Sequence, residues 1–440
     1  MKTAGIVSAG ITTVGVLSTV PAVHAVGSDV IKVGLIGCGG RGMGSIVDRL
    51  KVGDAIKIVA LGDLNETRAT QRMTELSTME AAAGKVDLSP DHVFFGFDSY
   101  KKVTELVDVV HICSPAGFHP DHFLHAVEKG KHVFMEKPFC VDAEGYRRCM
   151  KANKIAEEKG LTVCAGFQRR HEQKYLEWIS RIHAGAIGDV LSTRMFWNGG
   201  SGAGSRLEGE TEISFQIRRW YIFNWLCGDH IVEQHCHNID VGNWIHGKGE
   251  PLAHPVSCAG NGGRQVRKSP KFPPAACGNI FDHHYVEYRY ADDSVMISTC
   301  RQTPNCWNNV AEMVSGTKGS GGTSWEAAWL RPTGEERWNA PKGRNPYEQE
   351  HVNQAEMIRK GERLHDGWHA ATSSMTAVMG RMATYSGQEI KWDDAVAKGK
   401  SLFPYDVELT VDTIPPLMPG PDGTYEHAVA IPGEYNPYVA

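Results

Sequence analysis

The sequence predicts an α/β protein in which an N-terminal Rossmann domain, with a doubly wound parallel sheet, precedes a C-terminal α+β domain with an open, mainly antiparallel sheet. Strand-like and helix-like segments alternate from residue 31 to residue 166, and a glycine fingerprint follows the first strand. Longer strand-like runs replace this alternation after Gln168. A chain of 440 residues is long enough for two such domains, each with its own core.

Six strands are expected in the N-terminal domain, because short apolar runs recur between polar helical stretches. They lie at Ile31–Gly37, Ile56–Asp63, His92–Gly96, Val107–Ser114, His132–Glu136 and Leu161–Gly166. The first helix starts at Arg41, and a long helix is opened by Asp142, a typical N-cap residue, and stopped by Gly160. We place this domain at residues 29–168.

The C-terminal domain is expected at residues 169–414, followed by an extended arm at residues 415–440 where Pro and Gly are frequent. Its strand-like runs indicate antiparallel pairing and lie at Leu191–Trp197, His284–Tyr290, Val295–Arg301 and Val310–Ser315. Polar or glycine-rich stretches at Gly199–Ser205 and Gly260–Pro274 are typical of loops that border a cleft. The linker between the domains is short, so we expect the active site in the cleft between them.

The segment Gly37-Cys38-Gly39-Gly40-Arg41-Gly42 has the glycine spacing of dinucleotide-binding folds. Gly37 permits the tight turn after the strand, Gly39 lets a pyrophosphate approach the backbone, and Gly42 lets the helix pack closely. Gly40 adds conformational freedom. The N–H groups at the start of the following helix are then free to bind phosphate.

Asp63 ends the second strand about 20 residues beyond the fingerprint, where a carboxylate accepts hydrogen bonds from the adenosine ribose hydroxyls. Its charge would repel a 2′-phosphate, so the sequence favours NAD over NADP. Arg41 and Arg68 lie near Asp63 in the sequence and could bind a 2′-phosphate, so NADP is the alternative cofactor.

The strand His132–Glu136 ends in Glu136-Lys137-Pro138 and delivers a lysine to the carboxyl edge of the sheet, where doubly wound folds bind ligands. An ammonium group there can hydrogen-bond a substrate oxygen and exchange a proton with it, if burial or neighbouring charges lower its pKa. A solvated surface charge is the alternative interpretation of Lys137.

Residues 230–246, preceded by Gly228-Asp229 and followed by Gly247, are expected to form one capped helix. Spacings of three and four place one set of side chains on one face: His230, Glu233, His237, Asp240 and Trp244. That face suits a proton relay beside a lysine or, alternatively, a solvated surface. We expect no metal on His230, Glu233, His235 and His237, because helical residues two apart point about 200° from each other. His235 is then a packed histidine.

Bulk properties narrow the class of protein further. The formal net charge is -5, and no long Lys/Arg run is present, which argues against nucleic-acid binding. The 11 cysteines lack the spacing of a disulfide framework and are expected to be mostly buried thiols.

Residues 1–25 are predicted to be a signal peptide, because an apolar run is followed by Val23-His24-Ala25. The mature chain has no span of roughly 20 apolar residues that could cross a membrane.

The glycine fingerprint, Glu136-Lys137-Pro138, Ser114-Pro115 followed by His119, and Gln168-Arg169-Arg170 together resemble the Gfo/Idh/MocA oxidoreductases. The resemblance extends over the whole mature chain and is closest to a secreted bacterial branch with Glu-Gln-His-x-His, here residues 233–237. The start of the chain resembles a twin-arginine signal that lacks its arginine pair. We therefore expect a periplasmic or otherwise exported protein.

The resemblance implies an NAD(P)-dependent enzyme that transfers a hydride between a carbohydrate or polyol carbon and the nicotinamide. Outside the cytoplasm its cofactor would be tightly bound, and a homodimer or homotetramer is implied as well. An NAD-dependent glycoside hydrolase or lyase, which oxidises the sugar only transiently, is the alternative. A catalytically idle nucleotide- or sugar-binding protein is the alternative from another class.

The resemblance also assigns roles to single residues. Lys137 and His237 would transfer the proton of the substrate hydroxyl, and Glu233 would orient these two side chains or influence their charge. Family members usually have aspartate at the position of Glu233. The residues implied at the cofactor are Gly37, Gly39, Gly40, Arg41, Gly42, Asp63, Ser114, Pro115, His119, Glu136, Lys137 and Gln168. Charged and aromatic residues near the helix are the candidates for sugar contacts, namely Arg169, Arg170, Arg219, Trp220 and Asp240.

Overall fold

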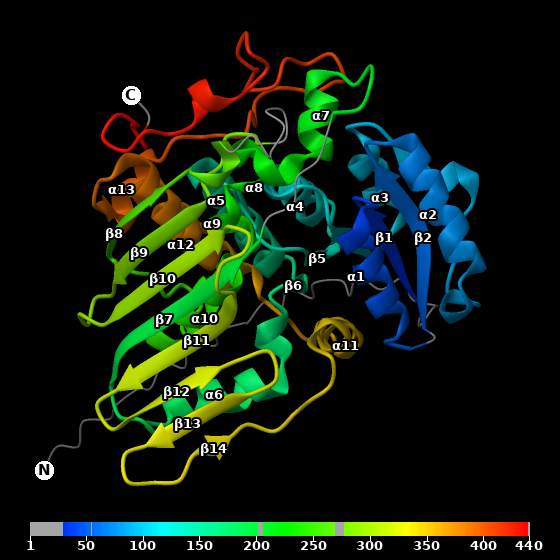
Figure 1. The fold of residues 1–440 in the computed structure, drawn as a ribbon. Coiled ribbons are helices and arrows are strands. Elements are labelled where there is room, and N and C mark those ends of the chain that lie inside the picture. The colour runs from blue at the N-terminus through cyan, green and yellow to red at the C-terminus, as the bar shows by residue number, and fades with distance from the viewer. Residues whose placement is uncertain (1–29, 54, 201–205, 269–276, 439–440) are drawn as a thin grey trace, which may run out of the picture.

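The computed structural model describes residues 30–438 apart from residue 54 and residues 201–205 and 269–276 (Figure 1). The predicted signal peptide lies outside these described residues, as do parts of the two predicted cleft loops. The predicted fold class is confirmed, because a parallel six-stranded sheet is followed by a mixed, mainly antiparallel sheet of nine strands.

The first sheet has the strand order β3-β2-β1-β4-β5-β6, and every neighbouring pair is parallel. Its strands lie within the predicted ranges: β1 (Ile31–Ile36), β2 (Ile56–Asp63), β3 (Val93–Phe95), β4 (Val109–Ile112), β5 (His132–Met135) and β6 (Val163–Ala165). The strand order changes direction between β1 and β4. The carboxyl ends of these strands therefore border the crevice where doubly wound folds bind ligands.

Helices cover both faces of this sheet, because its buried strands are apolar on both sides. One face packs against α1 (Gly40–Leu50), α2 (Glu66–Thr78) and α11 (Pro346–Lys360). The other packs against α3 (Ser99–Leu106), α4 (His119–Glu128) and α5 (Ala143–Glu158). Asp142 caps α5 as predicted, since its Oδ1 accepts a hydrogen bond from Gly145 N at 2.8 Å.

The second sheet has the order β14-β13-β12-β11-β7-β10-β9-β8-β15. Only β7 and β10 pair in parallel among its described strands. The strands are β7 (Val190–Gly199), β8 (Ser257–Gly263), β9 (His283–Arg289), β10 (Val295–Gln302), β11 (Asn309–Gly316), β12 (Gly319–Thr323), β13 (Ala328–Pro332), β14 (Trp338–Asn339) and β15 (Ile390–Lys391).

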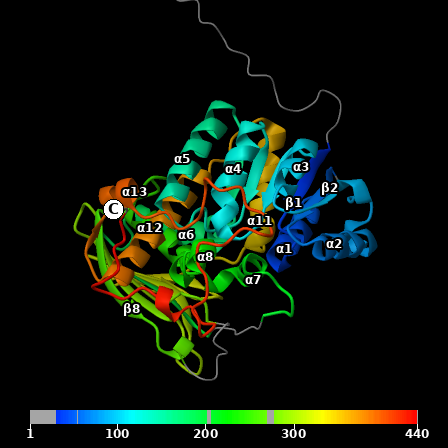
Figure 2. The same cartoon turned by 90° about the horizontal axis from the view of Figure 1, so that it is seen from above.

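Helices α6 (Gln173–His183), α10 (Cys236–His246) and α12 (Gly367–Ser386) pack against one face of the second sheet. Helix α12 also packs against α5, so it lies between the two sheets (Figure 2). One apolar core therefore runs from the first sheet through α5 and α12 to the second sheet. This continuous core fixes how the carboxyl edge of the first sheet faces α10.

Two details of the predicted C-terminal domain are wrong. The helix expected at residues 230–246 is divided into α9 (His230–Glu233) and α10, because His235 N bonds His230 O at 3.1 Å, one residue further back than in an α-helix. As a result His230 does not share a face with His237. The loop expected at Gly260–Pro274 is strand β8 up to Gly263, where its backbone pairs with β9.

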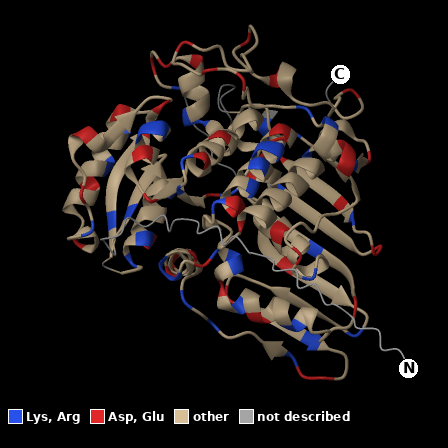
Figure 3. Cartoon of the chain, turned by 180° about the vertical axis from the view of Figure 1, so that it is seen from behind, with Lys and Arg blue, Asp and Glu red and all other residues tan. Residues whose placement is uncertain are grey.

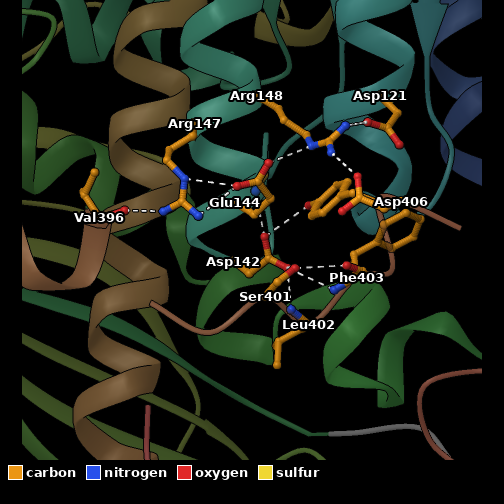
Figure 4. A network of polar contacts seen from close by, with 12 residues as sticks. Asp121, Asp142, Glu144, Arg147, Arg148, Val396, Ser401, Leu402, Phe403 and Asp406 are labelled. Atoms are coloured by element: carbon orange, nitrogen blue, oxygen red, sulfur yellow. Dashed lines mark hydrogen bonds and ion pairs between the residues drawn. The ribbon is translucent and has the colours of Figure 1, made fainter. Parts of the chain in front are cut away.

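The C-terminal segment after α13 (Trp392–Lys398) packs across the N-terminus of α5 (Figure 4). Asp142 Oδ2 accepts hydrogen bonds from Leu402 N at 2.7 Å and Phe403 N at 3.0 Å. The Phe403 ring packs on Phe118 and Trp225, and it lies where a side chain at Gly117 would stand. Phe403 therefore packs against the segment after β4, close to the carboxyl edge of the first sheet.

Lys and Arg residues are interspersed with Asp and Glu residues along the described ribbon (Figure 3). In the described part of the chain, no helix combines the length and the apolar character needed to cross a membrane.

Replacing Phe403 with alanine is expected to lower the free energy of unfolding by about 3–5 kcal/mol, because the ring is 4% exposed and fills a contact between two segments. Chemical denaturation measures this change. Val411→Ala, at a side chain that is 54% exposed, is the matched control and should change it by less than about 0.5 kcal/mol. Equal behaviour of both variants would show that the segment is not part of the cooperative core.

Candidate active site

A cavity of about 300 Å³ lies between the carboxyl edge of the first sheet and helices α9 and α10. Residues from the glycine loop, from the ends of β4, β5 and β6, and from the C-terminal half of the chain line it. They are Arg41, Cys113, Ser114, Ala116, His119, Glu136, Lys137, Gly166, Trp220, Glu233, His237 and Tyr347. All three predicted catalytic residues are among them.

Lys137 and Glu233 form a buried ion pair in this cavity. Lys137 Nζ lies 2.7 Å from Glu233 Oε1 and also donates to the Glu233 backbone oxygen at 2.6 Å. Burial acts to lower the pKa of Lys137, but the Glu233 carboxylate outweighs it, so this pKa lies above its usual value. Lys137 is therefore a charged hydrogen-bond donor rather than a base.

His237 lies in the same cavity between aromatic rings. Its imidazole stacks on Trp197 at a centroid distance of 5.7 Å and meets the edge of Phe167 at 5.7 Å. Burial, and then the charges of Lys137 and Arg169, hold the pKa of His237 well below its usual range. His237 is thus neutral at physiological pH and can accept a proton.

Arg41 crosses the cavity from the glycine loop. Its Nε donates to Glu136 Oε1 at 2.5 Å, and its guanidinium carbon lies 4.8 Å from the centre of the Tyr347 ring. Behind this pair, Glu350 is fully buried with its nearest Arg41 nitrogen at 3.9 Å. Burial, and then the neighbouring Glu136, raise the pKa of Glu350 well above its usual range.

The glycine loop fits a dinucleotide. Gly37 has φ +91, and a Cβ at Gly42 would lie 2.0 Å from Gly37 O, so both positions require glycine. At Gly39 and Gly40 a Cβ would meet nothing within 4 Å among the described residues, which leaves the loop's outer side open. Gly39 offers no side-chain cap to α1, so the N-terminal N–H groups of that helix can bind phosphate.

Asp63 lies at the end of β2 beside this loop. Its Oδ2 accepts a hydrogen bond from Cys38 N at 2.8 Å, and its Oδ1 accepts one from Asn65 N at 2.9 Å. Arg68 Nη1 lies 3.3 Å from the same Oδ1. The carboxylate therefore anchors the glycine loop directly, and a basic side chain stands next to it.

The remaining residues predicted at the cofactor divide into two groups. Ser114, His119 and Glu136 line the cavity, whereas Pro115 and Gln168 are not among its lining residues. His119 joins the ends of β4 and β5, because its ring nitrogens lie 2.7 Å from Ser114 O and 2.7 Å from Pro138 O. Gln168 Nε2 donates to the Tyr347 hydroxyl at 3.2 Å behind the cavity.

The residues predicted to contact substrate are mostly engaged with other protein groups. Arg169 Nη1 bonds Glu312 Oε1 at 2.6 Å, and Arg170 Nε bonds Asp240 Oδ2 at 2.8 Å. Arg219 does not line the cavity, whereas its neighbour Trp220 does. Among the five predicted residues, Trp220 alone therefore faces the space where a substrate would bind.

His369, at the start of α12, connects two carboxylates beside His237. Its Nδ1 lies 3.3 Å from Asp240 Oδ1, and its Nε2 lies 3.4 Å from Asp366 Oδ1. Asp366 in turn accepts from the backbone of β6, at Ala165 N, over 3.2 Å. Burial and Arg170 act to lower the pKa of His369, but the two carboxylates outweigh them and raise it.

Several lining or packing residues were not predicted from the sequence, among them Tyr347, Trp197 and Cys113. Tyr347 comes from α11, far along the chain from the glycine loop. Trp197 lies in β7, and the alternating pattern of that strand does not show that the Trp197 ring will stack on His237. Cys113 precedes a predicted residue, and its strand-end position was the signal that could have identified it.

Residues 31–167 match the Gfo/Idh/MocA family model, described as "Oxidoreductase family, NAD-binding Rossmann fold". An inositol 2-dehydrogenase/D-chiro-inositol 3-dehydrogenase of Halalkalibacterium halodurans is 34% identical over 168 residues, which is 37% of this chain and 43% of that protein. A scyllo-inositol 2-dehydrogenase (NADP(+)) of Bacillus subtilis is 24% identical over 48% of this chain and 52% of its own length. This chain thus spans less than half the length of the first of these relatives.

Solved structures share the fold over both sheets. Aldose-aldose oxidoreductase from Caulobacter crescentus, complexed with glycerol, superposes with a TM-score of 0.64 at 16% identity, over 82% of this chain and 99% of that one. Levoglucosan dehydrogenase in complex with NADH and levoglucosan gives a TM-score of 0.64 at 15% identity, again over 82% and 99%. At these identities the likeness establishes the fold alone.

The bonds of His369 predict a pH-dependent stability. A histidine whose pKa is raised on folding stabilises the protein fully below about pH 6.5, and this contribution is lost as the pH rises through the folded-state pKa. Urea unfolding between about pH 6 and about pH 9 should therefore show a decline in the free energy of unfolding that His369→Gln reduces. His427→Gln, at an exposed histidine, should leave the decline unchanged. An unaltered decline in His369→Gln would contradict this assignment.

Proposed function

Because residues 31–167 match the NAD-binding Rossmann model of the Gfo/Idh/MocA oxidoreductases, we propose that this protein transfers a hydride between a carbohydrate or polyol carbon and NAD. The observation that carries the proposal is the Lys137–Glu233 ion pair in one cavity with a neutral His237, at the carboxyl edge of the parallel sheet. Relatives that cover this region include inositol dehydrogenases, which supports a polyhydroxylated substrate.

The chemistry of the chain's own residues follows from their charges. NAD held by the glycine loop, the start of α1 and Asp63 would supply the hydride acceptor. The Lys137 ammonium binds and orients the oxygen of the substrate hydroxyl as a charged donor. His237, kept neutral by burial, accepts the proton of that hydroxyl, and Glu233 keeps Lys137 charged and in place.

A sugar ring suits the remaining walls of the cavity. Trp220 offers an aromatic face that can cover the apolar side of a pyranose or an inositol ring. The volume of about 300 Å³ is at the small end for ligand pockets, which favours a single ring at the reacting position. Arg169 and Arg170, bound to Glu312 and Asp240, would support the walls rather than contact the sugar.

NAD rather than NADP is the cofactor we favour. Asp63 ends β2, where a carboxylate in doubly wound folds accepts hydrogen bonds from the adenosine ribose, and its charge would repel a 2′-phosphate. Arg68 beside it is the feature that would serve NADP instead. In an exported protein a tightly bound cofactor is favoured, because free nucleotide is scarce outside the cytoplasm.

Export and self-association complete the proposal. Residues 1–25 are predicted to be a signal peptide, from which we infer a periplasmic location. Nine of the cysteines are buried and Cys306 is exposed, so few thiols could form disulfides in an oxidising compartment, and the free cysteines are compatible with that location. Helices α6, α10 and α12 cover one face of the nine-stranded sheet, which supports a homodimer or homotetramer that uses the other face.

The test begins with denaturing the purified protein and identifying any released nucleotide by mass. Stoichiometric reduction of bound or added NAD by a sugar or polyol is the expected result, followed as nicotinamide absorbance. Product formation without net reduction would establish the hydrolase or lyase cycle instead. If neither intact protein nor protein with added NAD or NADP binds nucleotide, the proposal is overturned.

Lys137→Ala and His237→Ala should each lower kcat by about 10²–10⁴-fold, because the first removes the charged donor that orients the substrate oxygen and the second removes the proton acceptor. Cofactor affinity should stay within about threefold of the original value, since the glycine loop is untouched. Steady-state kinetics and a nucleotide titration measure the two effects. Near-normal turnover in both variants would contradict their assigned roles.

Glu233→Gln should move the alkaline limb of the pH–rate profile to lower pH. Removing the carboxylate that raises the pKa of Lys137 lets this ammonium lose its proton earlier as the pH increases. Glu233→Asp should retain part of the original limb, because the charge remains. Glu144→Gln on α5, where Glu144 pairs with Arg147 and Arg148, is the matched control and should leave the profile unchanged.

A further inference from the structure

A second cluster of polar side chains lies apart from the cavity, where the start of α9 meets β9. Asp229 caps α9, His230 is its first residue, and His284 projects from β9. One ligand atom of each lies within 4.8 Å of the other two, and the three side chains are buried. Asp229 Oδ1 stands 3.3 Å from His284 Nε2 and 3.9 Å from His230 Nε2.

The hydrogen bonds around Asp229 fix its carboxylate firmly. Oδ2 accepts from Phe281 N at 2.8 Å and from the Tyr385 hydroxyl at 2.6 Å, and Oδ1 accepts from His230 N at 2.5 Å. Asp229 also has φ +78, a backbone conformation that non-glycine residues rarely adopt, so the surrounding contacts must hold it there. The carboxylate is thereby presented to both imidazole rings.

Both rings turn Nε2 toward this oxygen, and for His284 the hydrogen bonds show that this nitrogen has a free lone pair. The Thr384 hydroxyl donates to Arg381 O at 3.0 Å and therefore accepts from His284 Nδ1 at 2.9 Å. A neutral His284 then carries no proton on Nε2. Neither His284 Nε2 nor His230 Nε2 has a hydrogen-bond partner among the described residues, although both atoms are buried. Leaving such atoms unpaired is costly, and a cation between them would remove that cost.

Another buried cluster, formed by Cys164, His171 and Asp366, differs in the tautomer of its histidine. Asn353 Nδ2 donates to His171 Nδ1 at 2.8 Å, because its Oδ1 already accepts from Gln349 Nε2. A neutral His171 therefore carries its proton on Nε2, which faces Asp366 Oδ2 at 3.3 Å. His171 Nε2 also lacks a hydrogen-bond partner among the described residues, but it directs a proton rather than a lone pair toward the carboxylate, so this histidine is not arranged to bind a cation.

We propose that Asp229, His230 and His284 bind one divalent transition-metal ion, with Zn²⁺ as the species that their chemistry fits best. Two imidazoles and one carboxylate are a common zinc ligand set, with metal–ligand distances of about 2.0–2.2 Å. Ligand atoms around a tetrahedral ion then lie about 3.3–3.5 Å apart, which the Asp229–His284 separation of 3.3 Å matches, whereas His230 Nε2, at 3.9 Å from Asp229 Oδ1, would move slightly closer. The bond from His284 Nδ1 to Thr384 orients the ring as the outer hydrogen bonds of metal-bound histidines do.

The site has a structural role, since none of its three residues lines the cavity. It joins α9 to the second sheet, and Glu233 lies at the other end of the same four-residue helix. The metal therefore fixes the segment that carries the partner of Lys137. This inference rests on the cluster alone and does not depend on the proposed oxidoreductase activity.

The first test is the metal content of the full chain, purified without a histidine tag and washed with a weak chelator. We expect one Zn²⁺ per chain by plasma mass spectrometry in the original protein, and background levels in His230→Gln and His284→Gln. His246→Gln is the matched control, because His246 is also buried and bonds only the Thr193 and Ser294 hydroxyls. It should retain the metal. Metal retained by both ligand variants would overturn the assignment.

A second test uses the original protein only, so it does not depend on the folding of variants. Removing the metal with a strong chelator should lower Tm by more than about 2 °C, and adding Zn²⁺ should restore it. Co²⁺ in place of Zn²⁺ should give the visible absorption of a site with imidazole and carboxylate ligands. If the original protein binds neither ion and its Tm does not respond, the proposal is wrong.

Discussion

The buried ion pair between Lys137 and Glu233 is the interaction on which the arrangement of the cavity depends. Taking either charge out of water costs several kcal/mol, and only close approach of the other charge offsets that cost. The two residues lie 96 positions apart, one at the end of β5 and one at the end of α9. The pair therefore forms only if the first sheet and α9 are held at one distance. The continuous core through α5 and α12 supplies that constraint.

Other buried charges at the interface are balanced in the same way. Arg169 with Glu312 and Arg170 with Asp240 join the segment after β6 to the second sheet and to α10. Each guanidinium has a carboxylate partner and, unlike Lys137, does not line the cavity, so neither is placed to bind a ligand there. The free chemistry of the cavity is thus concentrated in the charged Lys137 and the neutral His237. A neutral base beside a charged donor can exist only where burial and neighbouring charges separate their protonation states.

Sequence patterns could predict those features of the fold and of the site that depend on local periodicity or on a residue's position at the end of a strand. The parallel strands, the glycine loop and the position of Lys137 follow from alternation and from the rule that ligands bind at carboxyl ends. Helix capping predicted α5, since Asp142 and Gly160 bracket it. Partnerships over long distances could not be predicted in this way. Nothing local marks Tyr347 for the cavity, and nothing near Arg170 in the sequence shows that Asp240 will neutralise it.

The break between α9 and α10 shows why spacing alone misjudged the polar segment at residues 228–240. On one continuous helix His230, Glu233 and His237 would share a face, and a single site would have to use all three. The bond from His235 N to His230 O adds a residue to the turn and rotates the two halves relative to each other. Glu233 and His237 consequently face the cavity, whereas His230 turns to Asp229 and His284. The segment at residues 228–240 therefore contributes side chains to two sites on its opposite sides. Contacts that fix the segment at the Asp229 cluster also fix the position of Glu233 in the cavity.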